Sequence, residues 1–231
     1  MPNIDIGFVI IWFVVFLFSL SFHEAAHAWT SERFGDDTGR HQGRITLNPI
    51  AHIDPIGTIL FPLIAMFTSV PLLGWAKPVQ TNPLLWRDKT RANISVSAAG
   101  PISNFILMTI AFIILKALIL AGMLTYNRAG QNMYEVIGPA PNQPGFMQPL
   151  SMFLGVMLIL NLALGVFNLI PIPPLDGSHV LEELLPYPMQ EAYYQLRPYG
   201  FLLLMALLYL GALRFIFNPI YVFIVSLVLG F

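Results

Sequence analysis

The chain has 231 residues, of which 56% are hydrophobic and only 10% are charged, and its mean hydropathy of +0.71 is more than a water-soluble core could hide. A formal net charge of -1 provides no overall basic field, so we expect no nucleic-acid partner. Cysteine is absent, which excludes disulfides, thiol catalysis and cysteine metal ligands and leaves histidine and carboxylate side chains as candidate ligands.

Five long, largely uncharged runs predict an all-α polytopic membrane protein in which residues 1–231 form a single integral-membrane domain. The runs lie at about 6–31, 56–74, 94–121, 150–170 and 199–230. The first, third and fourth carry few charges, namely the polar cluster discussed below and Lys116, and we expect them to form a core of three transmembrane helices.

The second run, 56–74, predicts a re-entrant hairpin rather than a crossing, because Pro62 and Pro71 break it. Cations lie on both of its flanks, so the positive-inside rule places both flanking loops in the cytoplasm. Irregular backbone at membrane depth must pack against protein or line a wet cavity, so this hairpin is expected to cover or line the functional site. The flanking cations are Arg33, Arg40, Arg44, Lys77, Arg87, Lys89 and Arg91.

Two short segments beside the hairpin, 43–49 and 76–83, resemble extended strands that end at Asn-Pro, and they could pair with each other. The whole segment 41–83 is therefore expected to combine a re-entrant hairpin with short β segments. The last apolar run, 199–230, is interrupted by Arg214 and Asn218-Pro219, which predicts two short membrane helices joined near 214–218.

The charge pattern also orients the core helices. Helix 6–31 runs from outside to inside, 94–121 returns, and 150–170 runs inward again, which leaves 122–149 as an external loop. The segment 171–198 then lies at the cytoplasmic face, and its amphipathic part is expected at the membrane interface.

The end of the first span carries the pattern HExxH, as His23-Glu24-Ala25-Ala26-His27. In a helix, a spacing of four residues places both imidazoles on one face, where they can hold one metal ion. A glutamate beside them can take a proton from the attacking water and later deliver it to the leaving amine. Ionisable residues are costly inside a membrane, and the alternative of solvated residues at a helix end would not need this spacing. We therefore expect one zinc ion per chain, with Glu24 as the catalytic base.

A catalytic zinc ion normally has three protein ligands, so one more must come from elsewhere in the chain. Asp176 is favoured because it follows helix 150–170, which enters the cytoplasmic leaflet in the same direction as helix 6–31. His52 and Asp54, at the mouth of the hairpin, are the rival ligands, and we expect them to gate the site or support the ligands. The full set of candidates is His41, His52, Asp54, Asp176, His179, Glu182 and Glu183. Of these, His179 could contact the substrate or a ligand.

Two of these motifs, HEAAH at 23–27 and NLIPIPPLDG at 168–177, resemble those of the site-2 protease family of intramembrane zinc metalloproteases. The resemblance spans most of the chain. It implies that His23, His27 and Asp176 are the zinc ligands. It further implies that Glu24 is the catalytic glutamate and that Asn168 helps to bind substrate near the metal.

The middle helix supports the same resemblance, because Ala98-Ala99-Gly100-Pro101-Ile102-Ser103-Asn104 is similar to the family's AGP-containing core helix. Its small residues allow close helix packing, and we assign them no chemistry. The chain has no PDZ-like insertion, and its segment 41–83 looks like the elaboration of a compact prokaryotic subgroup.

The sequence thus predicts a zinc metalloendopeptidase that cleaves transmembrane protein substrates within or near the cytoplasmic leaflet of a prokaryotic inner membrane. Its partners would be that substrate and the lipid bilayer. One alternative is a divalent-metal transporter that uses His23, Glu24, His27 and Asp176 in transit, although no repeated half is visible. Another is a membrane zincin of a different fold, with a glutamate as third ligand. The sequence identifies neither the substrate nor the oligomeric state.

Overall fold

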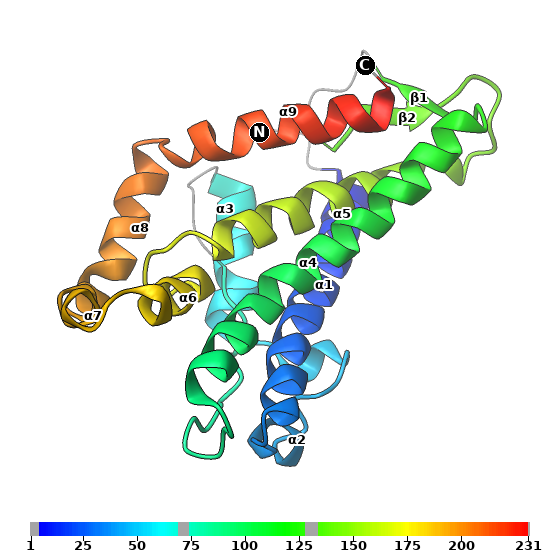
Figure 1. Ribbon diagram of the computed structural model, residues 1–231. Helices are drawn as coiled ribbons and strands as arrows, with labels where there is room; N and C mark the ends of the chain where they lie inside the picture. The colour runs from blue at the N-terminus through cyan, green and yellow to red at the C-terminus, as the bar shows by residue number, and fades with distance from the viewer. Residues whose placement is uncertain (1–4, 69–73, 128–133, 231) are drawn as a thin grey trace.

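The computed structural model describes residues 5–68, 74–127 and 134–230. Three long helices form its core (Figure 1): α1 (Ile6–Arg33), α4 (Lys89–Leu120) and α5 (Met147–Asn168). Within the described residues these three are long and apolar enough to cross a membrane, and the bent pair Tyr187–Tyr209 and Leu213–Leu229 makes a fourth if it forms one span. The predicted all-α polytopic fold with three core spans is therefore confirmed.

Helix α5 lies at the centre of this core. In the apolar 18-residue stretch of each helix, 61% of α5 is buried inside the protein, against 33% of α1 and 28% of α4. Helices α1 and α4 therefore leave more of their surface for contact with lipid. Glycine brings neighbouring elements close to it, since a Cβ at Gly165 would lie 2.8 Å from the ring of Phe105 on α4. Small residues at such positions allow the dispersion contacts that hold membrane helices together without a hydrophobic driving force.

Aspartates begin three of the apolar elements. Asp5 accepts a hydrogen bond from Gly7 N at 2.8 Å at the start of α1, and Asp88 accepts one from Arg91 N at 3.0 Å at the start of α4. Asp54 accepts from Ile56 N and Gly57 N at 3.0 and 2.7 Å. These side chains satisfy the amides that a helix N-terminus leaves without partners, and their charge suits the positive end of the helix dipole.

The hairpin begins as a single turn of π-helix, η2 (Pro55–Leu60), and continues as α3 (Phe61–Thr68). Its tip at 69–73, including Pro71, lies outside the described residues. The two described ends meet, because Thr58 Oγ1 donates to the carbonyl of Trp75 at 2.8 Å and Trp75 N donates to the carbonyl of Gly57 at 3.2 Å. The flanking loops therefore lie on the same side, as a re-entrant hairpin requires and a single crossing does not.

The expected pairing of 43–49 with 76–83 was wrong. The described strands are instead β1 (Leu124–Tyr126) and β2 (Ile137–Pro139), an antiparallel pair within the loop after α4. Backbone amides of 76–83 have other partners: Lys77 N donates to the carbonyl of His52 at 2.9 Å, and Val79 N donates to a glutamate side chain described below. Gln42, just before the first segment, donates a side-chain hydrogen bond of 3.2 Å to Gln80 of the second, which is not backbone pairing.

The C-terminal run forms two helices, α8 (Gly200–Tyr209) and α9 (Leu213–Leu229), and the chain bends by 63° between Tyr187–Tyr209 and Leu213–Leu229. Two helices were expected, but the break falls at 210–212 rather than at 214–218. Gly211 has φ +70°, a conformation that favours glycine, and it ends α8 there. Pro219 lies inside α9. The remaining short helices are α2 (Thr38–His41), η1 (Pro49–Ala51), α6 (Asp176–Leu184), α7 (Tyr187–Tyr194) and η3 (Arg197–Tyr199).

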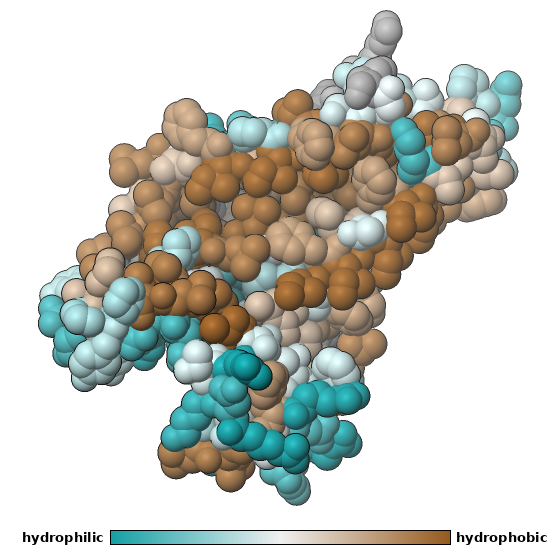
Figure 2. All heavy atoms as spheres, in the orientation of Figure 1, coloured by the Kyte–Doolittle hydropathy of each residue, from teal (hydrophilic) through white to brown (hydrophobic). Residues whose placement is uncertain are grey.

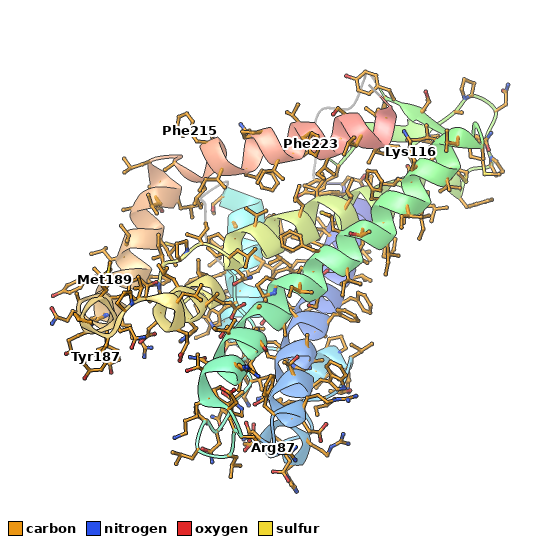
Figure 3. The ribbon with its side chains drawn as sticks, in the orientation of Figure 1. Arg87, Lys116, Tyr187, Met189, Phe215 and Phe223 are labelled. Atoms are coloured by element: carbon orange, nitrogen blue, oxygen red, sulfur yellow. The ribbon has the colours of Figure 1, made fainter. Side chains whose placement is uncertain are left out.

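Hydrophilic residues distinguish one end of the core from its apolar middle (Figure 2). Figure 2 shows hydrophobic residues over the middle of the molecule and hydrophilic residues gathered at the end where α1 leads into α2. In Figure 3, Arg87 lies at that end and Lys116 near the opposite end of α4, while Phe215 and Phe223 project from α9. Both phenylalanines are well exposed, as lipid-facing residues would be.

Candidate metal centre

Three potential ligands converge between α1 and the start of α6. His23 and His27 lie one turn apart on α1, and Asp176 is the first residue of α6. The two Nε2 atoms are 3.0 Å apart, and Oδ2 of Asp176 lies 3.2 Å from Nε2 of His23 and 3.5 Å from Nε2 of His27. Among the described residues, this is the one group of three or more histidine, aspartate or glutamate side chains placed to hold a metal ion.

The hydrogen bonds of the two Nδ1 atoms determine whether these Nε2 atoms carry a proton. Nδ1 of His27 lies 2.7 Å from the carbonyl of Val96, which can only accept, so this Nδ1 bears the proton. Nδ1 of His23 lies 2.7 Å from Oδ1 of Asn104, which also accepts. In its neutral form, each imidazole therefore presents an unprotonated Nε2 to the centre of the group.

Three lone pairs thus point at one another in a buried place, and this is repulsive unless a cation lies among them. Oδ2 of Asp176 is buried and has no hydrogen-bond donor. Zinc bonds of about 2.0 to 2.1 Å in a tetrahedral arrangement place ligand atoms about 3.3 Å apart, close to the separations found. Two nitrogens and one carboxylate oxygen also form a donor set that zinc accepts, so the residues fit this ion.

Gly100 on α4 provides the space for the ion. A Cβ at this position would lie 2.4 Å from Nε2 of His27 and 2.5 Å from Nε2 of His23. It would therefore occupy the point at which the three ligand atoms converge. The sequence had indicated only close packing for this glycine, because a small residue in a membrane helix usually serves packing.

The position of Asp176 is fixed by backbone packing at the end of α5. A Cβ at Gly177 would lie 2.2 Å from the carbonyl oxygen of Leu169, so only glycine lets α6 start this close to the preceding helix. Further along α6, Glu183 accepts a hydrogen bond of 2.8 Å from Asn93 on α4. Helix α6 is thereby held against the end of α5 and against α4.

Glu24 lies beside the two histidines on α1 and is 9% exposed. Its Oε2 accepts a hydrogen bond of 3.0 Å from the backbone N–H of Val79, in the chain that returns from the hairpin. The hairpin was expected to cover or line the site, and this contact brings its return segment to the glutamate. The sequence offered no sign of Val79 itself, because any residue other than proline supplies the same amide.

The rival ligands lie elsewhere. Asp54 caps the start of the hairpin with both contacts described above, and Nε2 of His52 lies 3.0 Å from the carbonyl of Thr46. Neither joins the group of three ligands. The Asp-Pro step of residues 54–55 could have indicated the cap from sequence, because proline is common at the first position of a helix.

The remaining candidates lie around α6 or on the surface. Glu182 forms an ion pair with Arg197 at 2.5 Å, and exposed His41 lies 3.6 Å from Asp37. His179 is half-buried, and burial together with the positive charge of Arg197 lowers its pKa below the usual 6.5. It is therefore neutral at neutral pH.

Asn168, the last residue of α5, is half-buried. Its Nδ2 donates to the carbonyl of Leu164 at 3.0 Å, one turn back along the same helix. That bond fixes the amide nitrogen on the helix and directs the side-chain oxygen elsewhere.

A protein-family model described as Peptidase family M50 matches residues 11–208. Two similar proteins bear names that begin "Putative zinc metalloprotease": YwhC of Bacillus subtilis and Rip2 of Mycolicibacterium smegmatis. YwhC is 38% identical over 194 residues, which cover 84% of this chain and 78% of YwhC. Rip2 is 33% identical over 224 residues, which cover 96% of this chain and 76% of Rip2. No solved structure matches the chain.

Proposed function

The chain belongs to peptidase family M50, the site-2 protease family, and from this premise we propose that it is an intramembrane zinc metalloendopeptidase of the HExxH type. Membership in the family, together with the apolar helices, makes it a metalloprotease integral to a membrane. The observation that carries the proposal further is the convergence of three lone pairs, from His23, His27 and Asp176, beside Glu24.

The proposed roles follow from the geometry. His23, His27 and Asp176 hold one zinc ion, in agreement with the names of the relatives. When bound, zinc supplies Lewis acidity, which activates water and polarises the scissile carbonyl. Glu24 takes the proton from the attacking water and delivers it to the leaving amine. Because Val79 engages Oε2 of Glu24, the proton transfer falls to the other carboxylate oxygen.

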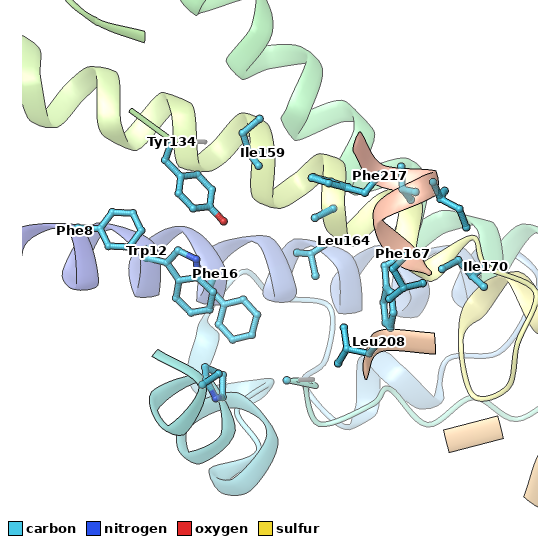
Figure 4. Close-up of a pocket in the computed structure, with 17 residues that line it drawn as sticks. Phe8, Trp12, Phe16, Tyr134, Ile159, Leu164, Phe167, Ile170, Leu208 and Phe217 are labelled. Atoms are coloured by element: carbon cyan, nitrogen blue, oxygen red, sulfur yellow. The ribbon is translucent and has the colours of Figure 1, made fainter. Parts of the chain in front are cut away.

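The substrate is a transmembrane protein segment, and an apolar cavity of about 580 Å³ gives it a place to dock. Figure 4 shows aromatic side chains of α1, including Trp12 and Phe16, facing Leu164 and Phe167 of α5 across this cavity, with Phe217 of α9 near its edge. A pocket with such a lining matches a membrane helix rather than a soluble peptide. Ile170, directly after α5, also lines it, so the cavity extends toward the loop that leads to Asp176.

Cleavage requires that the docked helix unwind, because its carbonyls are otherwise hydrogen-bonded and shielded within the helix. The unwound stretch would lie beside the return segment at 76–81, where strand addition can hold an extended backbone. Asn168 helps to bind it at the end of α5. The cations around the site's end of the core support cleavage in the cytoplasmic leaflet of a prokaryotic inner membrane.

The direct test replaces Glu24 with glutamine in full-length protein reconstituted with a membrane substrate. Glu24→Gln should retain zinc and lower the cleavage rate by about 10²- to 10⁴-fold, the usual contribution of a general acid–base group. Asp176→Ala should reduce the zinc content, whereas His41→Ala, on an exposed histidine, should not.

Cleavage by Glu24→Gln at the wild-type rate would show that this glutamate is not the base. If His52→Ala lost zinc and Asp176→Ala kept it, the assignment of Asp176 as the third zinc ligand would be wrong.

A further inference from the structure

A continuous chain of buried hydrogen bonds joins the three core helices behind His23. Nδ1 of His23 on α1 lies 2.7 Å from Oδ1 of Asn104 on α4, and Nδ2 of Asn104 donates to Oδ1 of Asn161 on α5 at 3.0 Å. Nδ2 of Asn161 in turn donates to the carbonyl of Met157 and to Oγ of Ser19, both at 2.9 Å. Both asparagines are completely buried. Two amides in the apolar centre of a membrane protein are costly, so they indicate a function.

The direction of this chain is fixed at Met157. A backbone carbonyl can only accept a hydrogen bond, so the amide nitrogen of Asn161 must face it and the amide oxygen must face Asn104. Asn104 must then turn its nitrogen toward Asn161 and its oxygen toward His23. An oxygen at that place accepts, and the proton of the neutral imidazole therefore sits on Nδ1.

The tautomer matters because only one of the two presents a lone pair at Nε2 to the metal. If Asn104 were turned over, its N–H₂ group would face Nδ1 of His23 and favour the tautomer with the proton on Nε2. That proton would point at Nε2 of His27 and at Asp176, and it would have to leave before a metal ion could bind. His27 needs no comparable side chain, because the carbonyl of Val96 fixes its tautomer directly.

We propose that Asn104, aimed by Asn161 and the Met157 carbonyl, is a positioning residue that fixes the tautomer of His23 and so raises the affinity of the site for zinc. This inference rests on the proposed zinc site. Gly100 lies one helical turn before Asn104, so one face of α4 both leaves room for the ion and holds a ligand in its binding state. Outer partners of this kind typically change metal affinity by about 10- to 100-fold.

The test measures zinc affinity of the full-length chain in lipid nanodiscs, by competition with a chelating dye. Asn104→Leu keeps the approximate volume and removes the acceptor, so the affinity should fall by about 10- to 100-fold. Asn104→Asp keeps an acceptor for the Nδ1 proton, and in its protonated form its O–H group can also replace the donation to Oδ1 of Asn161. It should therefore bind zinc within about threefold of wild type. Ser103→Ala, which removes a buried polar group from the adjacent position without a contact to either histidine, is the matched control.

A second readout does not depend on metal. In metal-free protein labelled with ¹⁵N in its imidazoles, two-bond ¹H–¹⁵N correlations show which nitrogen of His23 carries the proton. Wild type and Asn104→Asp should show it on Nδ1, and Asn161→Leu should show a mixture of tautomers because Asn104 is no longer aimed. This second variant also keeps the proposal testable if Asn104→Leu does not fold.

The outcomes separate this inference from the proposed function. If wild type binds zinc and cleaves substrate but Asn104→Leu binds zinc within twofold of wild type, the positioning role is overturned and the protease stands. If Asn104→Asp binds zinc as weakly as Asn104→Leu does, the loss of affinity comes from altered packing and the inference also fails. Failure of the wild-type chain itself to bind zinc would instead remove the proposed function.

Discussion

A methyl group at Gly100 would lie 2.4 Å from Nε2 of His27, which is closer than any carbon and nitrogen can approach without a bond. The missing side chain of Gly100 therefore leaves space in the metal centre, and it also allows α4 to pack closely against α1. Gly100→Ala should lower zinc affinity at least about 100-fold, because both imidazoles must move away from the methyl group. The cost in unfolding free energy is partly offset, since alanine is a better helix former by about 0.5 to 1 kcal/mol. Zinc competition and thermal unfolding measure the two effects. Gly145→Ala is the control, because a Cβ there meets nothing within 4 Å. Normal zinc binding by Gly100→Ala would contradict the placement of the ion.

The amide of Val79 is expected to set the orientation of Glu24. Val79→Pro removes the donor, and the loss of one hydrogen bond to a charged group, about 1.5 to 3 kcal/mol, corresponds to a 10- to 100-fold slower cleavage. Zinc content should not change, because Glu24 is not a ligand. Val79→Ala keeps the N–H and should cleave as wild type does. Equal rates for the proline and alanine variants would show that this contact has no part in catalysis.

The apolar cavity predicts a separation between substrates. Ala163→Trp places a large ring in the cavity, and it should lower cleavage of a transmembrane substrate at least tenfold while sparing zinc affinity and the cleavage of a short soluble peptide. The control is Ile110→Trp on the exposed face of α4. If both substrates were affected equally, the cavity would not be the docking site.

Asp36 is expected to stabilise the end of the core at which α1 leads into α2. Burial raises the pKa of this carboxyl, but hydrogen bonds from Thr38, Asn82 and Ser31 together lower the pKa by more than burial raises it. The pKa in the folded protein therefore lies below the ordinary 3.8. A depressed pKa stabilises the fold above pH 3.8, and the contribution is lost as the pH falls through the folded pKa. Asp36→Asn should cost about 1 to 3 kcal/mol of unfolding free energy at pH 7, because the amide cannot accept all three bonds.

Thermal unfolding of Asp36→Asn and wild type at pH 7 and near pH 3 tests this, since the difference between them should shrink in acid. Asp37→Asn, on the exposed neighbour, should change little. A gap that stays constant with pH would mean that the charge of Asp36 is not what stabilises this region.

Local spacing and helix direction predicted much of this molecule. The spacing of four positions from His23 to His27 places both on one helix face whatever the fold, and the inward direction of 150–170 was enough to suggest the depth of Asp176. Gly100 and Asn104 were missed as functional residues because each looks ordinary alone. Their spacing of four within an apolar span was the available signal, and Asn161 in the middle of another span was a second one.

The features that the sequence did not predict depend on tertiary contacts. The amides of Lys77 and Val79 bond to His52 and Glu24, partners far away in sequence, and so no local pattern could exclude the expected strand pair. The bend after α8 depends on the left-handed conformation of Gly211, whereas proline and charge had drawn attention to 214–218.

The sequence separation of the ligands has a consequence for biosynthesis. His27 and Asp176 are 149 positions apart (176 minus 27), so the first two ligands enter the membrane well before the third has been translated. Two imidazoles alone form an incomplete zinc site, and the base beside them also waits for the hairpin to be made. On the proposed assignment, a nascent chain that has not yet been translated past Asp176 therefore lacks a complete centre, and proteolytic capacity begins only after α6 has docked against the core.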